Sequence, residues 1–253
     1  MHLRTEARDC LYVNWILPAS AAPPLERPLR YELHSWRGEE WVFTTALFFR
    51  LSGLRSRSLP FVRLSYPQMS LRLYVFDEKD VPSVLFVRMW APLWVVPVAR
   101  LVGRQPARSG RFSYPRFSGS LPADEASWGL RAGGGLEVRC RPGAPAVGEG
   151  PEGLDWRRTV EAIRHRQRGY LLSGRGMRSL QRQQPSPEVV PMSAEVATAG
   201  LLEEVFVDAA PGTFDRPHSA WLCPRVPVVF ELGKSLIRPL AARRQMAAVP
   251  DGC

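Results

Sequence analysis

The sequence of 253 residues contains almost no lysine, since Lys79 and Lys234 are the only lysines among 34 basic residues. Its four cysteines are scattered without a Cys-x-x-Cys pair, and its four histidines are equally dispersed. This spacing excludes a zinc-ligand motif and a disulfide framework, so we expect no metal and no cofactor. The N-terminal residues also lack the apolar run of a secretory signal, which favours a cytoplasmic protein.

An uninterrupted apolar run long enough to cross a membrane is absent as well. Residues 84–103 come closest, but two arginines and two prolines interrupt them. We therefore expect no membrane partner. The same stretch is better interpreted as a strand followed by a helix at 93–104, which Gly103 can end.

The composition is that of a folded, basic protein. Apolar residues make up 45% of the chain and aromatic residues 10%, which is enough for a sizeable core. The net charge of +10 favours anionic partners at long range. We expect one domain over residues 1–238, with a flexible Pro/Gly/Ala-rich loop at 142–153 and a polar tail at 239–253. Whether the chain forms homo-oligomers is left open.

Segments typical of β-strands outnumber helical ones. Besides a central hairpin, strands are expected at 11–17, 29–36, 41–51, 61–66, 111–120, 127–132, 136–141 and 226–231, with a β-like ribbon at 170–184. An amphipathic helix is expected at 154–167, whereas 201–207 suits a strand or a helix. Strands and helices do not alternate regularly. The pattern therefore favours an α+β, mostly β fold, with a closed antiparallel β-barrel and a few covering helices.

The central hairpin joins residues 69–77 to residues 82–90 through a short charged turn. Along its first strand, alternate residues separate into two faces. One face is apolar and suits packing beneath the helix at 93–104; it consists of Met69, Leu71, Leu73 and Val75. We therefore expect Ser70, Arg72 and Tyr74, on the other face, to point into the barrel.

The position of Arg88 depends on the register of this hairpin. A turn that is symmetric about Asp80 places Arg88 opposite Arg72, and two guanidinium groups facing one pocket could bind a carboxylate or phosphate. A register that differs by one residue sends Arg88 to the other side of the sheet. We favour the plainer interpretation, in which each arginine pairs with an acidic residue or Arg88 points outward.

Four short motifs in the first 110 residues are similar to those of a known family. They are Asn14-Trp15, Gly38-Glu39-Glu40-Trp41-Val42, Leu71-Arg72-Leu73-Tyr74-Val75, and Ala99-Arg100 followed by Pro106. In combination they resemble the uncharacterised YqjF-like family, which is grouped with the acetoacetate decarboxylase-like superfamily. The resemblance implies a closed, mostly antiparallel barrel around a small-molecule pocket. Its candidate ligand-binding residues here are Gln68, Ser70, Arg72, Tyr74 and Arg88.

The chain departs from the family where the chemistry would be decided. The family commonly reads Phe-x-Glu-x-Asn-x-Arg-x-Tyr-Val, and this chain has other residues at the first three marked positions, namely Tyr66, Gln68 and Ser70. The Schiff-base lysine of acetoacetate decarboxylases follows a proline that resembles Pro106. Here Ala107 and Arg108 follow, and neither can supply the amine nucleophile. The resemblance therefore disfavours Schiff-base decarboxylation.

Three functions are compatible with these features. The first is a pocket for a small anionic or carbonyl-containing ligand, without Schiff-base chemistry. The second is an enzyme on the same barrel that uses Arg- and Tyr-assisted enolisation or hydration. The third is nonspecific nucleic-acid binding through Arg157–Arg182, a segment with eight arginines but no recognised nucleic-acid motif; we do not expect nucleic acid as the main partner. A hydrolase using His218 and Ser219 is disfavoured because no Gly-x-Ser-x-Gly elbow is present.

Overall fold

The computed structural model describes residues 2–101, 105–115, 125–151, 154–164, 166–173, 176–183 and 188–236. The fold is mostly β, as expected. Its strands are β1 (His2–Pro18), β2 (Arg30–Tyr31), β3 (His34–Trp36), β4 (Glu39–Ser56), β5 (Leu59–Phe76), β6 (Pro82–Ala91), β7 (Ala107–Ser109), β8 (Arg111–Ser113), β9 (Ala126–Arg131), β10 (Leu136–Pro142), β11 (Arg168–Ser173), β12 (Gly176–Gln183), β13 (Val190–Thr198) and β14 (Ser219–Leu236). Its helices are α1 (Val96–Leu101), α2 (Trp156–Arg164) and α3 (Gly200–Glu203), with a 3₁₀ turn η1 (Ala19–Ala21). The polar tail expected at 239–253 lies outside the described residues.

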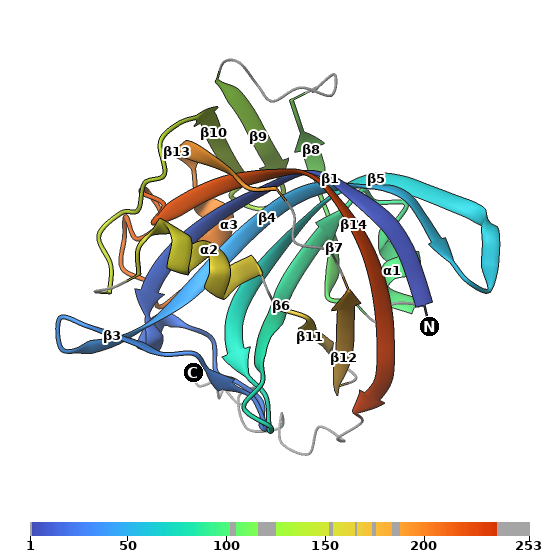
Figure 1. Cartoon of the computed structure of the whole chain (residues 1–253), viewed down its shortest axis with the longest axis horizontal. Helices are drawn as coiled ribbons and strands as arrows, with labels where there is room; N and C mark the ends of the chain where they lie inside the picture. Colours follow the sequence, from blue (N-terminus) through green and yellow to red (C-terminus); the bar gives the residue numbers. More distant parts are fainter. Residues whose placement is uncertain are drawn as a thin grey trace, which may run out of the picture.

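Within the described ranges, seven strands pair in a ring. The order of hydrogen-bonded neighbours runs β1-β4-β5-β6-β11-β12-β14, and β14 pairs with β1 in addition. The first and last strands are antiparallel, with His2 opposite Glu231 and Asn14 opposite Ser219. Figure 1 shows the long, curved strands of this ring with α2 in front of them.

The strand pairings confirm the predicted hairpin, and they include two parallel pairs. β5 and β6 are antiparallel from the Met69–Trp90 pair to the Phe76–Pro82 pair. However, β6 runs parallel to β11 and to β7, so the sheet is mostly antiparallel with two parallel pairings. Parallel neighbours require a long crossover connection. The chain between β6 and β11 provides it by building β8, β9, β10 and α2 on the way.

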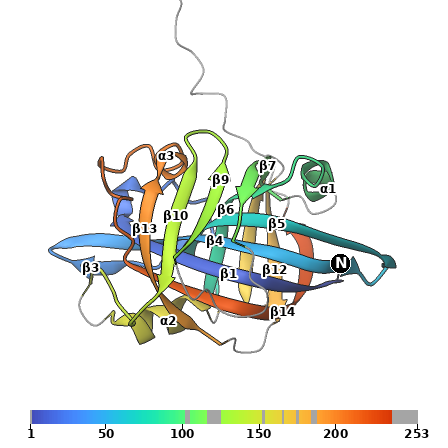
Figure 2. The same cartoon turned by 90° about the horizontal axis from the view of Figure 1, so that it is seen from above.

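A second layer of strands covers one side of the ring. From β14 the sheet continues through β13, β10, β9 and β8, and Figure 2 shows β13, β10 and β9 crossing over β1, β4 and β5. The apolar core between the two layers includes Trp15, Leu71, Leu73 and Trp128. The apolar face of β5 therefore packs beneath this second layer. The predicted packing beneath a helix at 93–104 is wrong, because α1 lies beside β7 instead.

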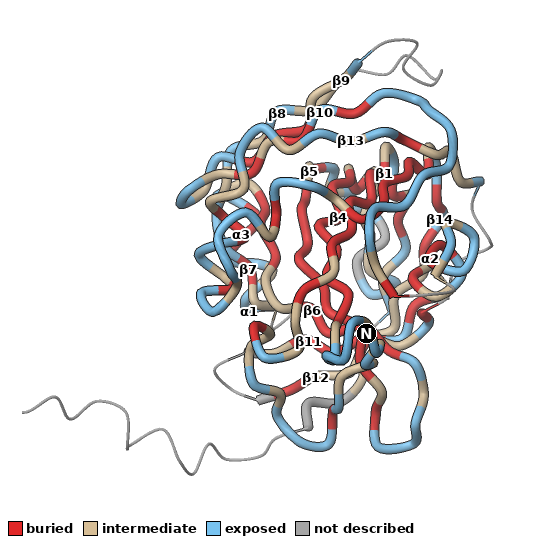
Figure 3. Tube along the Cα trace, turned by 90° about the vertical axis from the view of Figure 1, so that its left-hand side faces the viewer, coloured by how far each residue is buried: buried red, intermediate tan, exposed pale blue. Residues whose placement is uncertain are grey.

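The interior of the ring holds a second core. It contains Tyr12, Tyr74 and Trp221 from the strands and Val160 and Ile163 from α2. The apolar stripe of α2 thus covers one end of the ring. In Figure 3 the buried residues follow the middle of β1, β4, β5 and β6, whose two faces serve the two cores.

A bulge in β1 decides which of its residues face the ring interior. The register against β4 shifts between Arg8 and Leu11, and Asp9 adopts a φ of 53°. The extra residue lets Ala7 and Cys10 both belong to the interior core although they are three residues apart. In a regular strand, Cys10 would point to the opposite face.

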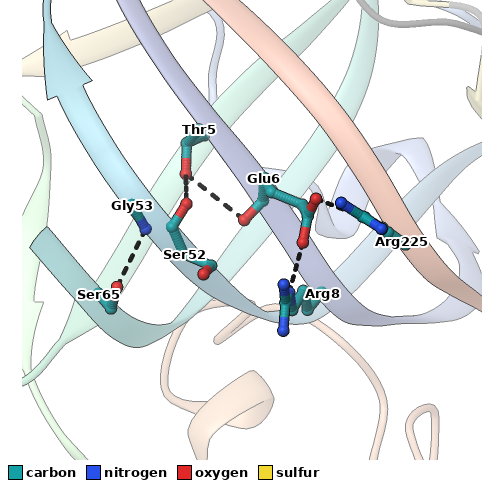
Figure 4. A network of polar contacts seen from close by, with 7 residues as sticks. All are labelled: Thr5, Glu6, Arg8, Ser52, Gly53, Ser65 and Arg225. Atoms are coloured by element: carbon teal, nitrogen blue, oxygen red, sulfur yellow. Dashed lines mark hydrogen bonds and ion pairs between the residues drawn. The ribbon is translucent and has the colours of Figure 1, made fainter. Parts of the chain in front are cut away.

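Polar contacts hold this irregular part of β1 against its neighbours (Figure 4). The Glu6 carboxylate accepts hydrogen bonds from Arg8 and from Arg225 of β14. The Thr5 hydroxyl donates to the backbone oxygen of Ser52 in β4 over 3.1 Å. Ties to strands on both sides keep β1 in place where its own ladder of hydrogen bonds is interrupted.

Several predicted segments are present with different bounds. The segment at 29–36 divides into β2 and β3, and the helix at 154–167 is confined to α2. The ambiguous segment at 201–207 begins within the short helix α3, and the final strand grows into the 18-residue β14. β13 was not predicted, because Val190–Thr198 mixes small and polar residues without a clear period.

Candidate functional site

A cavity lies inside the ring and is lined by residues from all seven of its strands. Its volume is about 80 Å³, several times the roughly 10–15 Å³ that a single water needs. Aliphatic and aromatic side chains form most of the wall. Its polar or ionisable lining residues are Cys10, Tyr12, Tyr66, Gln68, Arg72, Gln105 and Arg182.

The cavity approaches the surface at the end of the ring away from α2. Its lining residues Leu3, Leu54 and Phe230 are only half-buried, whereas Tyr12 and Arg72 are buried at 4% and 5% exposure. Leu3 pairs with Phe230 near the N-terminal end of β1. The polar groups are therefore deep in the cavity, behind an apolar entrance.

Arg72 points into the ring because the parity of β5 alternates regularly from Met69 to Val75. Its Nε donates to the hydroxyl of Ser70 over 2.9 Å. Its guanidinium lies 5.0 Å from the ring centroid of Phe86, the residue directly opposite on β6. The predicted inward position of Arg72 matches this geometry, and one side of the guanidinium is covered by an aromatic face.

Arg182 of β12 lines the same cavity and is 9% exposed. One of its terminal nitrogens donates to the backbone oxygens of Arg166, at 2.9 Å, and Arg164, at 3.2 Å. Arg164 is the last residue of α2, where the carbonyl groups carry a partial negative charge. The end of α2 thus fixes the Arg182 side chain against the cavity.

The two cavity arginines have no carboxylate partner in the part of the chain that the structure describes. Burial lowers the pKa of Arg72; Arg182 lowers it further, while the phenols of Tyr12 and Tyr74 act in the opposite direction. An arginine side chain nevertheless keeps its charge in proteins. The cavity therefore holds two positive charges, and a buried charge without a counter-charge is energetically costly.

Tyr74 lies behind Arg72 in a chain of buried hydroxyl groups. The Thr45 hydroxyl donates to Asn14 Oδ1 over 2.6 Å, so its oxygen is left to accept from Tyr74, 2.7 Å away. Asn14 Nδ2 in turn donates to the hydroxyl of Ser219. Burial raises the pKa of Tyr74 to about 12. Its proton is therefore directed towards Thr45.

Tyr12 and Cys10 are the other ionisable groups deep in the cavity. Burial raises the pKa of both side chains, although the two arginines lower it in each case. Both groups are therefore neutral near pH 7. Tyr12 is a proton donor in the field of Arg72 and Arg182, and its ring stacks on Trp221 with centroids 5.3 Å apart.

The predicted site residues divide into three groups. Arg72 and Gln68 line the cavity. Ser70 and Tyr74 are fully buried next to it, where Ser70 supports Arg72 and Tyr74 bonds to Thr45. Arg88 lies elsewhere, in an outer groove.

Arg88 is directed outward by a bulge in β6. Phe86 is opposite Arg72 and Arg88 is opposite Leu71, so Val87 is an extra residue between them. The hypothesis that Arg72 and Arg88 share one pocket is wrong for this reason. The second cavity arginine is Arg182. From the sequence it was recognised only as one of the eight arginines of the basic segment Arg157–Arg182.

The two lysines of the chain are not placed for Schiff-base chemistry by any described contact. Lys79 is exposed in the turn between β5 and β6, and the side chain of Lys234 lies outside the described part. Ala107, which follows Pro106, is buried in β7, and Arg108 lines the outer groove. Neither residue enters the cavity lining.

The basic segment Arg157–Arg182 is not one continuous surface. Arg166 is buried and pairs with Glu32 at 2.7 Å, and Arg168 pairs with Asp77 at the same distance. Arg182 faces the cavity. His165 of this segment lies outside the described residues. Internal partners thus occupy several arginines that a nucleic-acid surface would need.

His218 and Ser219 serve the packing of the ring. His218 is buried, with its ring 5.2 Å from that of Phe43, while Ser219 bonds to Asn14. Burial lowers the pKa of His218. In the described ranges no group of three or more His, Cys, Asp or Glu side chains could hold a metal ion. Nor does any helix there have the length and apolar character needed to cross a membrane.

The fold is similar to those of several solved structures. The enduracididine biosynthesis enzyme MppR, complexed with the condensation product of pyruvate and imidazole 4-carboxaldehyde, has a TM-score of 0.60 at 14% identity, covering 94% of this chain and 90% of that one. The same enzyme complexed with pyruvate has a TM-score of 0.52 at 15% identity, and the alignment covers 92% of this chain and 87% of that one. An acetoacetate decarboxylase-like enzyme from Sphingomonas wittichii RW1 has a TM-score of 0.58 at 12% identity, and the alignment covers 92% of this chain and 91% of that one. The fold is therefore acetoacetate decarboxylase-like.

Residues 4–226 match the DUF2071 family, described as an uncharacterized conserved protein. The chain belongs to this family, which is the YqjF-like family that its motifs resemble. No curated protein matches the chain.

Proposed function

We propose that the ring acts as a closed barrel, formed by a single domain over residues 1–238, that binds a small organic anion between Arg72 and Arg182. The observation that carries this proposal is the convergence of two buried guanidinium groups, without a described carboxylate, on one cavity. A ligand carboxylate would supply the missing counter-charge. Guanidinium groups bind carboxylates in bidentate geometry, which also fixes the orientation of the ligand.

The size and walls of the cavity support a small ligand with a carbonyl or short apolar body. Its volume of about 80 Å³ suits a few heavy atoms beyond the carboxylate. Gln68 and Tyr12 can donate hydrogen bonds to a carbonyl oxygen, and the aliphatic walls suit a short chain. The structural relative MppR binds pyruvate, which is an anion of this kind.

Schiff-base decarboxylation is not part of this proposal. The position that follows Pro106 holds Ala107, and Lys79 is exposed in a turn. Borohydride treatment in the presence of acetoacetate should therefore give no covalent adduct by intact-protein mass spectrometry.

Thermal-shift titration with matched ligands tests anion binding. Pyruvate, acetoacetate and butyrate should raise the melting temperature, whereas the uncharged butyramide should not. Arg72→Gln and Arg182→Gln should abolish the rise, and Arg72→Lys should weaken it because a lysine cannot bind in bidentate geometry. Arg141→Gln, on the exposed part of β10, is the matched control. Equal shifts with butyramide, or shifts that survive both glutamine variants, would overturn the proposal.

A second candidate function is proton-transfer catalysis in the same cavity. It is favoured by the position of Tyr12, a neutral phenol next to the two arginines. In such a step water or hydroxide in the cavity would take the α-proton of the ligand, arginine would stabilise the enolate that forms, and the neutral phenol would return a proton to its carbon. Exchange of the α-hydrogens of pyruvate or 2-oxobutyrate with deuterium, followed by NMR, would detect this activity. Loss of exchange in Tyr12→Phe with unchanged anion binding would support catalysis, and absence of exchange would leave a binding protein.

A further inference from the structure

Helix α1 and the turn before it are apolar on two opposite sides. Val95 and Val96 are buried at 3% and 6% exposure. Four other large apolar side chains are exposed at 73%, 56%, 49% and 77%, namely Leu93, Trp94, Val98 and Leu101. A helix that is hydrophobic all round is normally buried. Among the described residues, this ridge of four exposed side chains, the α1 ridge, therefore has no cover.

An arginine-rich groove lies directly beside the α1 ridge. It is an open hollow of about 1000 Å³ that includes Leu93 of the ridge. Its basic lining residues are Arg88, Arg100, Arg108, Arg111 and Arg131. Glu204 is the one acidic residue of this lining among the described residues, and it accepts a hydrogen bond from the backbone of Gly134.

These arginines are held in mutually repulsive positions. Arg111 and Arg131 are directly opposite each other on β8 and β9, and like charges in that position destabilise a sheet. Burial lowers the pKa of Arg88 and the nearby Arg108 lowers it further, whereas Glu204 acts in the opposite direction. Arg100 is fixed to the groove by its hydrogen bond to the backbone oxygen of Ala107, 2.8 Å away. A bound layer of negative charge would relieve this repulsion.

A second exposed apolar site lies at the same end of the molecule. Phe61 and Val62, near the turn between β4 and β5, are 79% and 41% exposed, and they are flanked by the exposed Arg57 and Arg63. Figures 1 and 2 both place this turn at the end of the ring where α1 lies. Tyr66 of β5 touches Trp94, with ring centroids 5.9 Å apart. The five steps along the chain from Phe61 to Tyr66 span only about 16 Å of strand.

We propose that this end of the ring, comprising the α1 ridge, the arginine groove and the β4–β5 turn, docks on the surface of an anionic phospholipid membrane. The arginines would contact lipid phosphates, and Trp94, Leu101 and Phe61 would enter the boundary between headgroups and acyl chains. Leucine and valine side chains gain free energy in such a boundary but not against a nucleic-acid backbone. The docking is peripheral, and it departs from the sequence-based expectation of no membrane partner.

Vesicle co-sedimentation tests the docking. The full chain should bind vesicles of phosphatidylcholine with 30% phosphatidylglycerol and should not bind phosphatidylcholine alone. Binding should weaken in 0.5 M NaCl because salt screens the arginines. Trp94→Ser combined with Leu101→Ser should lower the partition coefficient about tenfold or more. Arg108→Gln combined with Arg111→Gln should reduce binding to the anionic vesicles selectively.

Matched controls come from the opposite end of the ring. Leu33, between β2 and β3, is 44% exposed, and Leu33→Ser should leave vesicle binding unchanged, as should Arg141→Gln. Absence of binding to the anionic vesicles would overturn the proposal. It would also be overturned if sedimentation velocity showed a dimer that Trp94→Ser with Leu101→Ser dissociates, because a second copy would then cover the ridge. Binding to duplex DNA that requires the groove arginines but not Trp94 or Leu101 would overturn it as well.

Discussion

Arg72 and Arg166 are buried to nearly the same extent, at 5% and 6% exposure, yet they meet opposite surroundings. Arg166 forms an ion pair of 2.7 Å with Glu32 and lies 5.6 Å from the ring of Tyr74. Arg72 also lies against an aromatic ring, but its described hydrogen bond goes to the uncharged Ser70. One guanidinium is neutralised by the chain itself, whereas the other is left for a ligand to neutralise.

Burial alone therefore does not assign a role to an arginine. A buried arginine with its own carboxylate stabilises the fold. Removing either partner leaves the other charge buried without a counter-charge, which is destabilising. A buried arginine with no carboxylate is maintained at that cost. In this ring the first kind lies next to α2 and the second kind faces the cavity.

The largest expected effect is the loss of the Arg166 partner. Glu32→Gln should lower the free energy of unfolding by about 3 kcal/mol, because it leaves a buried guanidinium without its counter-charge. Urea denaturation measures this loss, which should be the same with and without a bound anion. Arg37→Gln is the control, since its pair with Glu149 is exposed and should contribute less than about 0.5 kcal/mol. If Glu32→Gln lost as little unfolding free energy as the control, the proposed difference between Arg166 and Arg72 would be wrong.

Arg72→Met should change the free energy of unfolding by a comparable amount, but only when an anion is present. Without an anion its free energy of unfolding should be unchanged or somewhat higher than that of the native chain, because an apolar side chain replaces a buried charge. At an anion concentration of 100 times Kd the native chain should gain about 2.7 kcal/mol, and the variant should gain nothing. Paired urea titrations with and without pyruvate measure both values. A large loss of unfolding free energy without ligand would show that Arg72, like Arg166, stabilises the fold by itself.

A third prediction concerns acid stability and the second internal ion pair. Burial alone would raise the pKa of Asp77, but hydrogen bonds from the Val81 and Lys79 amides and from Arg168 and Tyr170 outweigh it and lower the pKa. A lowered folded pKa stabilises the protein above the unfolded value of about 3.9, and this stabilisation is lost as the pH falls through the folded pKa.

Asp77→Asn should therefore lower the free energy of unfolding by about 2 kcal/mol at pH 7. This loss should become smaller as the pH falls below 4. Urea denaturation at several pH values, compared with the native chain, measures this dependence. A constant difference across the whole pH range would contradict it.

The smallest effect is expected at Tyr74. Tyr74→Phe removes the hydrogen bond to Thr45 and should cost about 1 kcal/mol of unfolding free energy. Its anion affinity should stay within about twofold of the native value, because the Tyr74 proton points to Thr45. Isothermal titration with pyruvate measures the affinity. A tenfold loss would restore Tyr74 to the ligand site as the sequence first suggested.

The sequence predicted the part of the site that depends on local alternation. The parity of β5 turned Arg72 and Gln68 inward, and this needed only a regular strand with one apolar face. Arg88 could not be placed, because the extra residue Val87 changes the register in the middle of β6. Cys10 faces the interior for a similar reason, since its parity depends on the bulge at Asp9.

Arg182 shows why long-range pairing was not accessible. It enters the cavity only because β12 lies between β11 and β14, and that order follows from the parallel pairing of β6 with β11. No local pattern encodes a parallel crossover of this length. The second layer was missed for the same reason. Its strands are short, and their apolar residues acquire a partner only when they cross β1, β4 and β5.

The pairing of β1 with β14 has a consequence for how the protein is made. His2 and Glu231 are neighbours in the finished sheet, so β1 leaves the ribosome long before β14, the strand with which it pairs. Until β14 is synthesised, one edge of β1 has free backbone groups that could recruit a strand from another nascent chain. Contacts of such long sequence separation also form slowly. Production of this protein should therefore depend on chaperones that shield the β1 edge, and a chain that stops before residue 219 should aggregate.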